Sequence, residues 1–130
     1  SRPFKGIPLK DEGDVPMVKT EDQLRNLLST YIERLRKGIR LEKVILYGSY
    51  AEGHPHPESD LDLAVISPDF GADRLADLQQ LCHSIPRHFE IEIEALAYTP
   101  HEYEEATPLD FLGQIKRKGR MVYENGRFCL

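Results

Sequence analysis

Two short apolar segments restrict the possible folds of this chain, because polar residues of particular types stand at their ends. Residues 44–47 are apolar and rich in β-branched side chains, and they stop abruptly at a Gly-Ser pair, residues 48–49. Residues 61–66 form a second apolar run, and two aspartates, Asp60 and Asp62, stand at its start. Apolar runs of this length bounded by turn residues predict buried strands. The sequence therefore predicts two strands whose ends hold chemically useful side chains.

The two aspartates lie on one face of the second predicted strand. Side chains alternate between the faces of a strand, so Asp60 and Asp62 share one face, about 7 Å apart, and Leu61 and Leu63 share the other. Two carboxylates facing one pocket repel each other unless solvent or a cation lies between them. Mg²⁺ is normally held by one or two carboxylates together with substrate phosphates. The pattern therefore predicts a Mg²⁺ site, with Mn²⁺ as an alternative, beside a phosphate-containing substrate.

Gly48 and Ser49 stand where such phosphates would be held. A glycine that leaves a strand allows a tight turn and a close approach of the backbone to a ligand. The next residues read as the start of a helix, whose free N–H groups form a nest for anions. The Ser49 hydroxyl can cap this helix or bond a phosphate oxygen. The expected order is strand, phosphate turn, loop and metal strand.

The Gly-Ser pair and the Asp-x-Asp triplet are separated by ten residues. This spacing resembles that of the minimal nucleotidyltransferases of the DNA polymerase beta-like superfamily, and the resemblance covers residues 20–123. It implies an α+β fold, the small mixed β-sheet of the polymerase beta palm with helices packed on one face. It also implies an enzyme that transfers a nucleoside monophosphate, with ATP as the favoured donor, to an acceptor hydroxyl and releases pyrophosphate.

A third carboxylate is expected from a strand predicted over residues 88–98. Its start alternates apolar residues with glutamates, and the helical segment before it is typical of a crossover between parallel strands of one sheet. The resembled family takes a third carboxylate from such a strand, and Glu94 stands at the usual distance before a Thr-Pro turn. Glu92 is the alternative, because a shift of two residues in the register of this strand would put Glu92 in the place of Glu94. A strand with its glutamates in solvent is also consistent with the pattern.

The resemblance assigns roles to these residues. Asp60, Asp62 and Glu94 are expected to bind metal and to be catalytic, and the turn at Gly48 and Ser49 is expected to bind the β and γ phosphates of the nucleotide. The third carboxylate would orient or deprotonate the incoming hydroxyl. The turn would act by positioning and charge neutralisation.

The rest of the chain predicts a single domain over residues 20–130, preceded by a mobile or loosely docked arm over residues 1–19. A capping box at Thr20 and Gln23 begins a helix that ends near Gly38. Two later helices are expected. Residues at helical spacing indicate the first, namely Leu75, Leu78, Leu81, Cys82 and Ile85, and the second spans 108–118 with Leu109, Leu112 and Ile115 facing inward. A short strand is expected at 120–123.

Composition excludes several classes of function. The 130 residues have a net charge of −5, with 22 acidic and 17 basic side chains, so non-specific binding to nucleic acid is an unlikely main function. No apolar run is long enough to span a membrane, and no signal segment opens the chain. The lone cysteines Cys82 and Cys129 fit reduced thiols. A cytoplasmic protein is expected.

The acceptor does not follow from the motif, which describes only the nucleotide half of the reaction. Minimal members of the resembled family are similar to the antitoxin half of a gene pair whose partner is a helical HEPN protein, and this resemblance implies such a partner as acceptor. The alternative is a catalytically silent, antitoxin-like binding module that neutralises a helical partner protein. Nucleotide preference and oligomeric state stay open.

Overall fold

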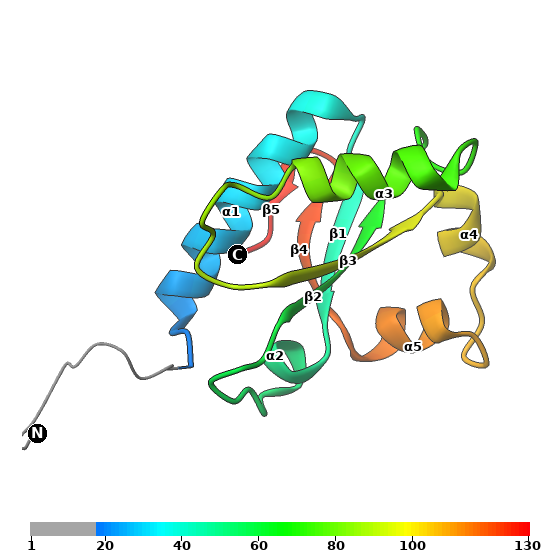
Figure 1. The fold of residues 1–130 in the computed structure, drawn as a ribbon. Helices are drawn as coiled ribbons and strands as arrows, with labels where there is room; N and C mark the ends of the chain where they lie inside the picture. Colours follow the sequence, from blue (N-terminus) through cyan, green and yellow to red (C-terminus); the bar gives the residue numbers. More distant parts are fainter. Residues whose placement is uncertain (1–17) are drawn as a thin grey trace, which may run out of the picture.

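The computed structural model describes residues 18–130, which form a five-stranded sheet with helices on both faces (Figure 1). The strands are β1 (Lys43–Tyr47), β2 (Leu61–Ile66), β3 (Ile93–Tyr98), β4 (Arg120–Glu124) and β5 (Arg127–Phe128). The helices are α1 (Glu21–Gly38), α2 (Ser49–Glu52), α3 (Arg74–His83), α4 (Pro100–Glu105) and α5 (Phe111–Lys118). All but the last two residues of the predicted arm, 1–19, lie outside the described residues.

The sheet is mixed, as predicted, and its strand order is β3-β2-β1-β4-β5. β2 and β3 run parallel and are joined by α3, which confirms the predicted crossover. β1 is antiparallel to both β2 and β4. Because β1 and β2 run in opposite directions, the end of β1 lies beside the starts of β2 and β3. The two motifs and the predicted third carboxylate therefore meet at one end of the sheet.

The helix α1 covers one face of the sheet and begins and ends where the sequence predicts. Thr20 caps it through the predicted capping box with Gln23. One side of the helix is buried against β1 and β2. The hydroxyl of its buried Tyr31 donates a hydrogen bond to the Leu81 carbonyl, 2.9 Å away, and so joins α1 to α3. The main core lies between these two helices and the sheet.

The helix α3 buries only some of the apolar residues whose spacing indicates it. Leu81 is buried, but Leu75 and Leu78 are 64% and 53% exposed. Asp77 is buried in their place, because its carboxylate accepts a hydrogen bond of 2.9 Å from the Gly71 N–H. The helix is present where the spacing predicts it, but the spacing does not identify its buried side.

A second, smaller layer of helices packs on the opposite face of the sheet. Leu112 and Ile115 of α5 pack on Ile45 and Ala64, and Tyr103 of α4 joins this cluster. The helix α5 begins at Phe111, three residues later than predicted. As a result Leu109 is not part of the helix and is 97% exposed, whereas Leu112 is buried as predicted.

The strand β3 is shorter than the predicted strand over residues 88–98. It begins only at Ile93, and His88 has a φ of 58°, which extended backbone does not adopt. The chain turns at this point before it enters the sheet. The alternation of glutamates thus lies partly in a loop and partly in the strand.

No helix within the described residues is long and apolar enough to cross a membrane. Cys82 and Cys129 are both free and exposed, as the sequence indicated.

Candidate active site

A row of three side chains crosses three adjacent strands at the end of the sheet. Asp62 on β2 is paired with Tyr47 on β1 and with Glu94 on β3. Residues paired in this way lie on the same face, and neighbouring strands are about 4.8 Å apart. Tyr47, Asp62 and Glu94 therefore point to one side of the sheet, the side on which α5 lies. The structure places the predicted Glu94 directly beside Asp62.

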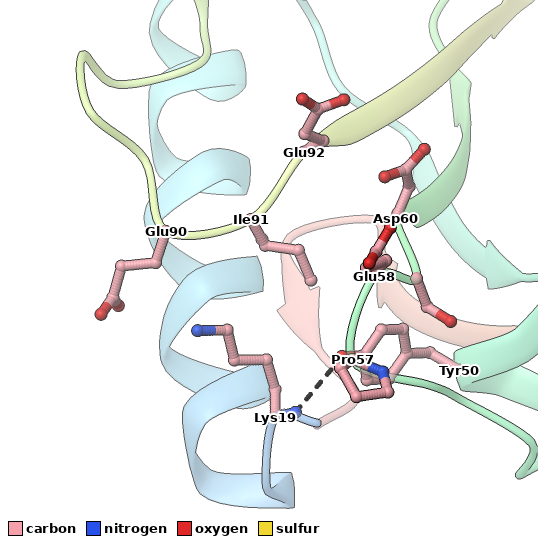
Figure 2. A pocket seen from close by; sticks show the side chains of 9 residues that line it. Lys19, Tyr50, Pro57, Glu58, Asp60, Glu90, Ile91 and Glu92 are labelled. Atoms are coloured by element: carbon pink, nitrogen blue, oxygen red, sulfur yellow. Dashed lines mark hydrogen bonds between the residues drawn. The ribbon is translucent and has the colours of Figure 1, made fainter. Parts of the chain in front are cut away.

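Asp60 lies one residue before β2, next to a cavity of about 480 Å³. The N–H of Leu61 donates a hydrogen bond to the Glu92 carbonyl, 2.9 Å away. Glu92 therefore lies next to Asp60, just before the paired residues of β2 and β3. Both acidic residues line this cavity (Figure 2). The figure also shows the hydrogen bond of 3.2 Å that the Lys19 N–H donates to the Tyr50 hydroxyl oxygen. The cavity thus opens from the Asp60 end of the site.

The two candidates for the third carboxylate therefore occupy different places. Glu94 is paired with Asp62 within the sheet, whereas Glu92 lies at the cavity beside Asp60. The charge of Glu94 is among the causes that raise the pKa of Asp62. Both glutamates are exposed. This arrangement favours Glu94 as the carboxylate that acts together with Asp62.

Gly48 brings the turn after β1 against the aspartate strand. Its backbone has φ 76° and ψ −155°, a conformation that other residues rarely adopt. A Cβ atom at this position would lie 2.3 Å from Oδ2 of Asp62. Only glycine therefore allows the backbone and this carboxylate to come so close. The amides of the first turn of α2, next to this contact, have no acceptor within the helix.

Ser49 does not cap α2 as the sequence suggested. No side-chain cap is present, and the Ser49 hydroxyl instead donates to the Ser59 hydroxyl oxygen at 3.1 Å. The Ser59 oxygen also accepts a hydrogen bond of 2.9 Å from the His56 N–H. Ser59 is buried and ties the turn after β1 to the loop before β2. Sequence reasoning did not single out Ser59, since a serine in a polar loop has no distinctive pattern.

Within residues 18–130, the acidic residues of the site form no ion pair, although Lys19 lines the same cavity as Asp60. None of the ion pairs formed within residues 18–130 includes Asp60, Asp62 or Glu94. Burial raises the pKa of Asp62 above its ordinary value, and the charges of Asp60 and Glu94 raise it further. No ion pair among the described residues compensates the negative charge of this cluster, and this favours a proton or a cation at Asp62.

The carboxylates of the site suit a hard divalent cation, provided that the substrate supplies further ligands. Over the described range, no three side chains of His, Cys, Asp or Glu lie close enough together to form a metal site by themselves. Asp60 and Asp62 supply two carboxylates, and Mg²⁺ typically takes its remaining ligands from water and substrate phosphates. The contact between Gly48 and Asp62 puts the turn suited to phosphates next to these carboxylates.

Tyr47 lies in the candidate site, although from the sequence it was expected only to be a strand residue. It is half-buried, and its ring packs edge-on against Phe111, with 5.7 Å between ring centroids. Burial and the neighbouring charges of Asp62 and Glu94, together with Tyr98, raise the pKa of Tyr47 to about 12. Its phenol therefore stays protonated at neutral pH and is available as a donor. Strand alternation reveals this position only once the register is known.

Comparison with protein families gives a match over most of the chain. Residues 29–127 match the family described as "Polymerase beta, Nucleotidyltransferase". A protein of Methanocaldococcus jannaschii named "Putative protein adenylyltransferase" is 29% identical over 84 residues, which cover 65% of this chain and 80% of that protein.

Two solved structures illustrate the shared fold. One is a "putative nucleotidyltransferase" from Sulfolobus solfataricus, with a TM-score of 0.62, 15% identity, and coverage of 84% of this chain and 89% of that one. The other is a chain in the complex of tri-AMPylated Shewanella oneidensis HEPN toxin with MNT antitoxin, with a TM-score of 0.52, 20% identity, and coverage of 79% and 72%. At these identities the likeness concerns the fold alone, and it agrees with the predicted polymerase beta palm.

Proposed function

Because this chain belongs to the polymerase beta nucleotidyltransferase family, we propose that it transfers AMP from ATP to a hydroxyl group of another protein. Its family makes it a nucleotidyltransferase, and the proposal adds the nucleotide, the metal and the acceptor. The observation behind it is the contact at Gly48, where a Cβ atom would lie 2.3 Å from the Asp62 carboxylate. This contact joins a turn suited to phosphates and a pair of carboxylates suited to a metal in one site.

In this proposal Asp60 and Asp62 hold Mg²⁺, or Mn²⁺, together with the phosphates of ATP. The bound cation neutralises phosphate charge, which is the chemistry that it supplies. The backbone at Gly48 and Ser49 positions the β and γ phosphates. Glu94 lies beside Asp62 and orients or deprotonates the acceptor hydroxyl. A bond forms between the acceptor oxygen and the α-phosphorus, and the bond to pyrophosphate breaks.

A protein acceptor is supported by the names of the similar proteins. The Methanocaldococcus jannaschii relative is named as a protein adenylyltransferase, and a structural neighbour contains an AMPylated HEPN toxin and its MNT antitoxin. We propose a HEPN-type protein as the partner and acceptor. The cytoplasm is the expected compartment, since it supplies ATP and keeps thiols such as the exposed Cys82 and Cys129 reduced.

The experiment follows the label of α-labelled ATP into proteins of a lysate of the source cells, with Mg²⁺ or Mn²⁺ present. We expect the wild type to label a protein, and Asp62→Asn to reduce the label at least about 100-fold, since a lost electrostatic partner of a reacting group costs on the order of 10²–10³ in rate. Asp22→Asn is the matched control, because Asp22 lies on the exposed side of α1 and its side chain is 88% exposed.

The outcomes separate the enzyme from a silent binding module. Label that depends on Asp62 but not on Asp22 supports AMP transfer, and mass spectrometry then identifies the acceptor. If the wild type labels nothing with any of the four nucleotides, the transfer proposal is wrong, and an antitoxin-like module that neutralises a partner by binding becomes the better hypothesis.

A further inference from the structure

An exposed apolar surface lies around the start of α5, on the same side of the sheet as the carboxylates. Its members, called here the α5 patch, are Leu96, Tyr98, Leu109 and Phe111. Leu109 is 97% exposed, Phe111 60% and Leu96 37%. Such large side chains are costly to leave in water, and a group of them indicates an interaction surface.

The α5 patch contains a depression that suits a side chain of a partner. A cavity of about 390 Å³ is lined by Tyr98, Phe111 and Leu112 and by the carboxylates of Glu102, Glu105 and Asp110. This volume is at the small end of the range of ligand pockets, about 300–1,000 Å³. Its lining therefore combines apolar and aromatic side chains with acidic ones.

The α5 patch continues directly from the active site. Leu96 and Tyr98 follow Glu94 at alternate positions of β3, so they share its face, about 7 Å and 13 Å further along the strand. On the other side, Phe111 packs against Tyr47, which is paired with Asp62. A molecule bound on the patch would therefore lie next to the third carboxylate.

The charged residues of this lining indicate what the occupant carries. Glu102 is paired with Arg74 at 3.1 Å. Neither Glu105 nor Asp110 takes part in an ion pair within the part of the chain that the structure describes. Asp110 accepts a hydrogen bond of 2.9 Å from the Thr107 N–H, but a neutral nucleobase would supply neither carboxylate with a cation. A protein segment with an apolar side chain and flanking lysines or arginines would match both the apolar and the acidic side chains of the lining.

We propose that the α5 patch is the docking surface for the acceptor protein, which inserts an apolar side chain into the cavity and places basic residues against Glu105 and Asp110. The inference rests on the proposed function, since it names the surface that brings the acceptor hydroxyl to Glu94. The cavity lies about 13 Å from Glu94 along β3. In the acceptor, the inserted side chain and the modified hydroxyl should therefore be about 13 Å apart, which equals about four residues of extended chain.

The test compares Leu109→Asp and Glu105→Lys with the wild type. The substrate is the protein that the wild type labels with α-labelled ATP, purified after its identification by mass. The measured quantities are kcat/KM for this acceptor and the Kd for ATP with Mg²⁺. The matched control is Leu75→Asp, because Leu75 is an exposed leucine like Leu109 but lies on α3, on the opposite side of the sheet.

We expect each patch variant to lower kcat/KM for the acceptor at least about tenfold, as for residues central to an interface, with a higher KM and an unchanged Kd for ATP. Leu75→Asp should change neither. An unchanged kcat/KM in the patch variants would overturn the docking surface and leave AMP transfer intact. Weaker ATP binding in these variants would assign the patch to the nucleobase and also overturn it. If the wild type itself labels no protein, both proposals fail.

Discussion

At the scale of single residues, the site depends on the fact that Gly48 lacks a side chain. The backbone conformation at Gly48 strains any other residue, and its missing Cβ leaves room for the Asp62 carboxylate. Gly53 has a similar positive φ of 81° but nothing within 4 Å of a Cβ atom. Comparing these two glycines therefore separates the strain of a positive φ from the displacement of the Asp62 carboxylate.

We predict that Gly48→Ala abolishes AMP transfer and Gly53→Ala does not. Both variants should lose about 1–3 kcal/mol of stability from strain, but only Gly48→Ala pushes Asp62 out of place. The measurement combines denaturant unfolding with the label-transfer assay. If Gly48→Ala retained wild-type transfer, the carboxylate would not need to lie against this turn.

Most of the residues at the site could be predicted from the sequence. Gly48, Asp60 and Asp62 follow from local spacing, and strand alternation puts both aspartates on one face. Glu94 needed the register between β2 and β3, which a long crossover leaves open to shifts of two residues. The roles of Ser59 and Tyr47 depend on contacts with other segments, and local sequence contains no trace of these contacts.

At the scale of elements, α5 is held against the turn that precedes it. A Cβ atom at Gly113 would lie 1.7 Å from the Thr107 carbonyl oxygen. Glycine in the middle of a helix usually lowers stability relative to alanine. Here it is required, since it lets α5 pack closely on the loop and on the sheet.

We therefore predict that Gly113→Ala lowers the free energy of unfolding by about 1–3 kcal/mol, as expected for overpacking. Replacing a helical glycine by alanine usually raises the free energy of unfolding, so the change expected here has the opposite sign. Arg117→Ala, at an exposed position of the same helix, serves as the control and should change stability by less than about 0.5 kcal/mol. A more stable Gly113→Ala would show that α5 can move away from Thr107 at no cost.

The elements themselves show where sequence reasoning reaches its limit. The helix α1 could be predicted to its ends, because its capping box and its apolar stripe agree. In α3 the leucine spacing was misleading, since the hydrogen bond that buries Asp77 turns Leu75 and Leu78 to solvent. The late start of β3 depends on the turn at His88. This turn could not be predicted, because the alternating glutamates after it are typical of a strand.

At the scale of the whole molecule, stability depends on pH through Asp62. Burial and the charges of Asp60 and Glu94 raise its pKa in the folded state. The folded protein therefore binds this proton more tightly than the unfolded chain does. Ionised Asp62 lowers the free energy of unfolding above the raised pKa, and this penalty disappears as the pH falls toward the ordinary pKa of aspartate.

We predict that Asp62→Asn is more stable than the wild type at pH 7 in buffer without divalent cations, and that the difference shrinks toward about pH 4, near the ordinary pKa of aspartate. Thermal unfolding of both proteins over this pH range measures it. Asp22→Asn, which removes an exposed carboxylate, should show no such gain. A variant less stable than the wild type at pH 7 would contradict an uncompensated charge at Asp62.

The position of Asp62 between two neighbouring strands has a consequence for engineering. β1 leads into the proposed phosphate turn, whereas β3 holds Glu94 and the first residues of the α5 patch. On this arrangement different segments, which come together around Asp62, bind the donor and the acceptor of the reaction. Exchanging surface residues of β3 and α5 should then redirect the enzyme to a new target protein while its use of ATP is preserved.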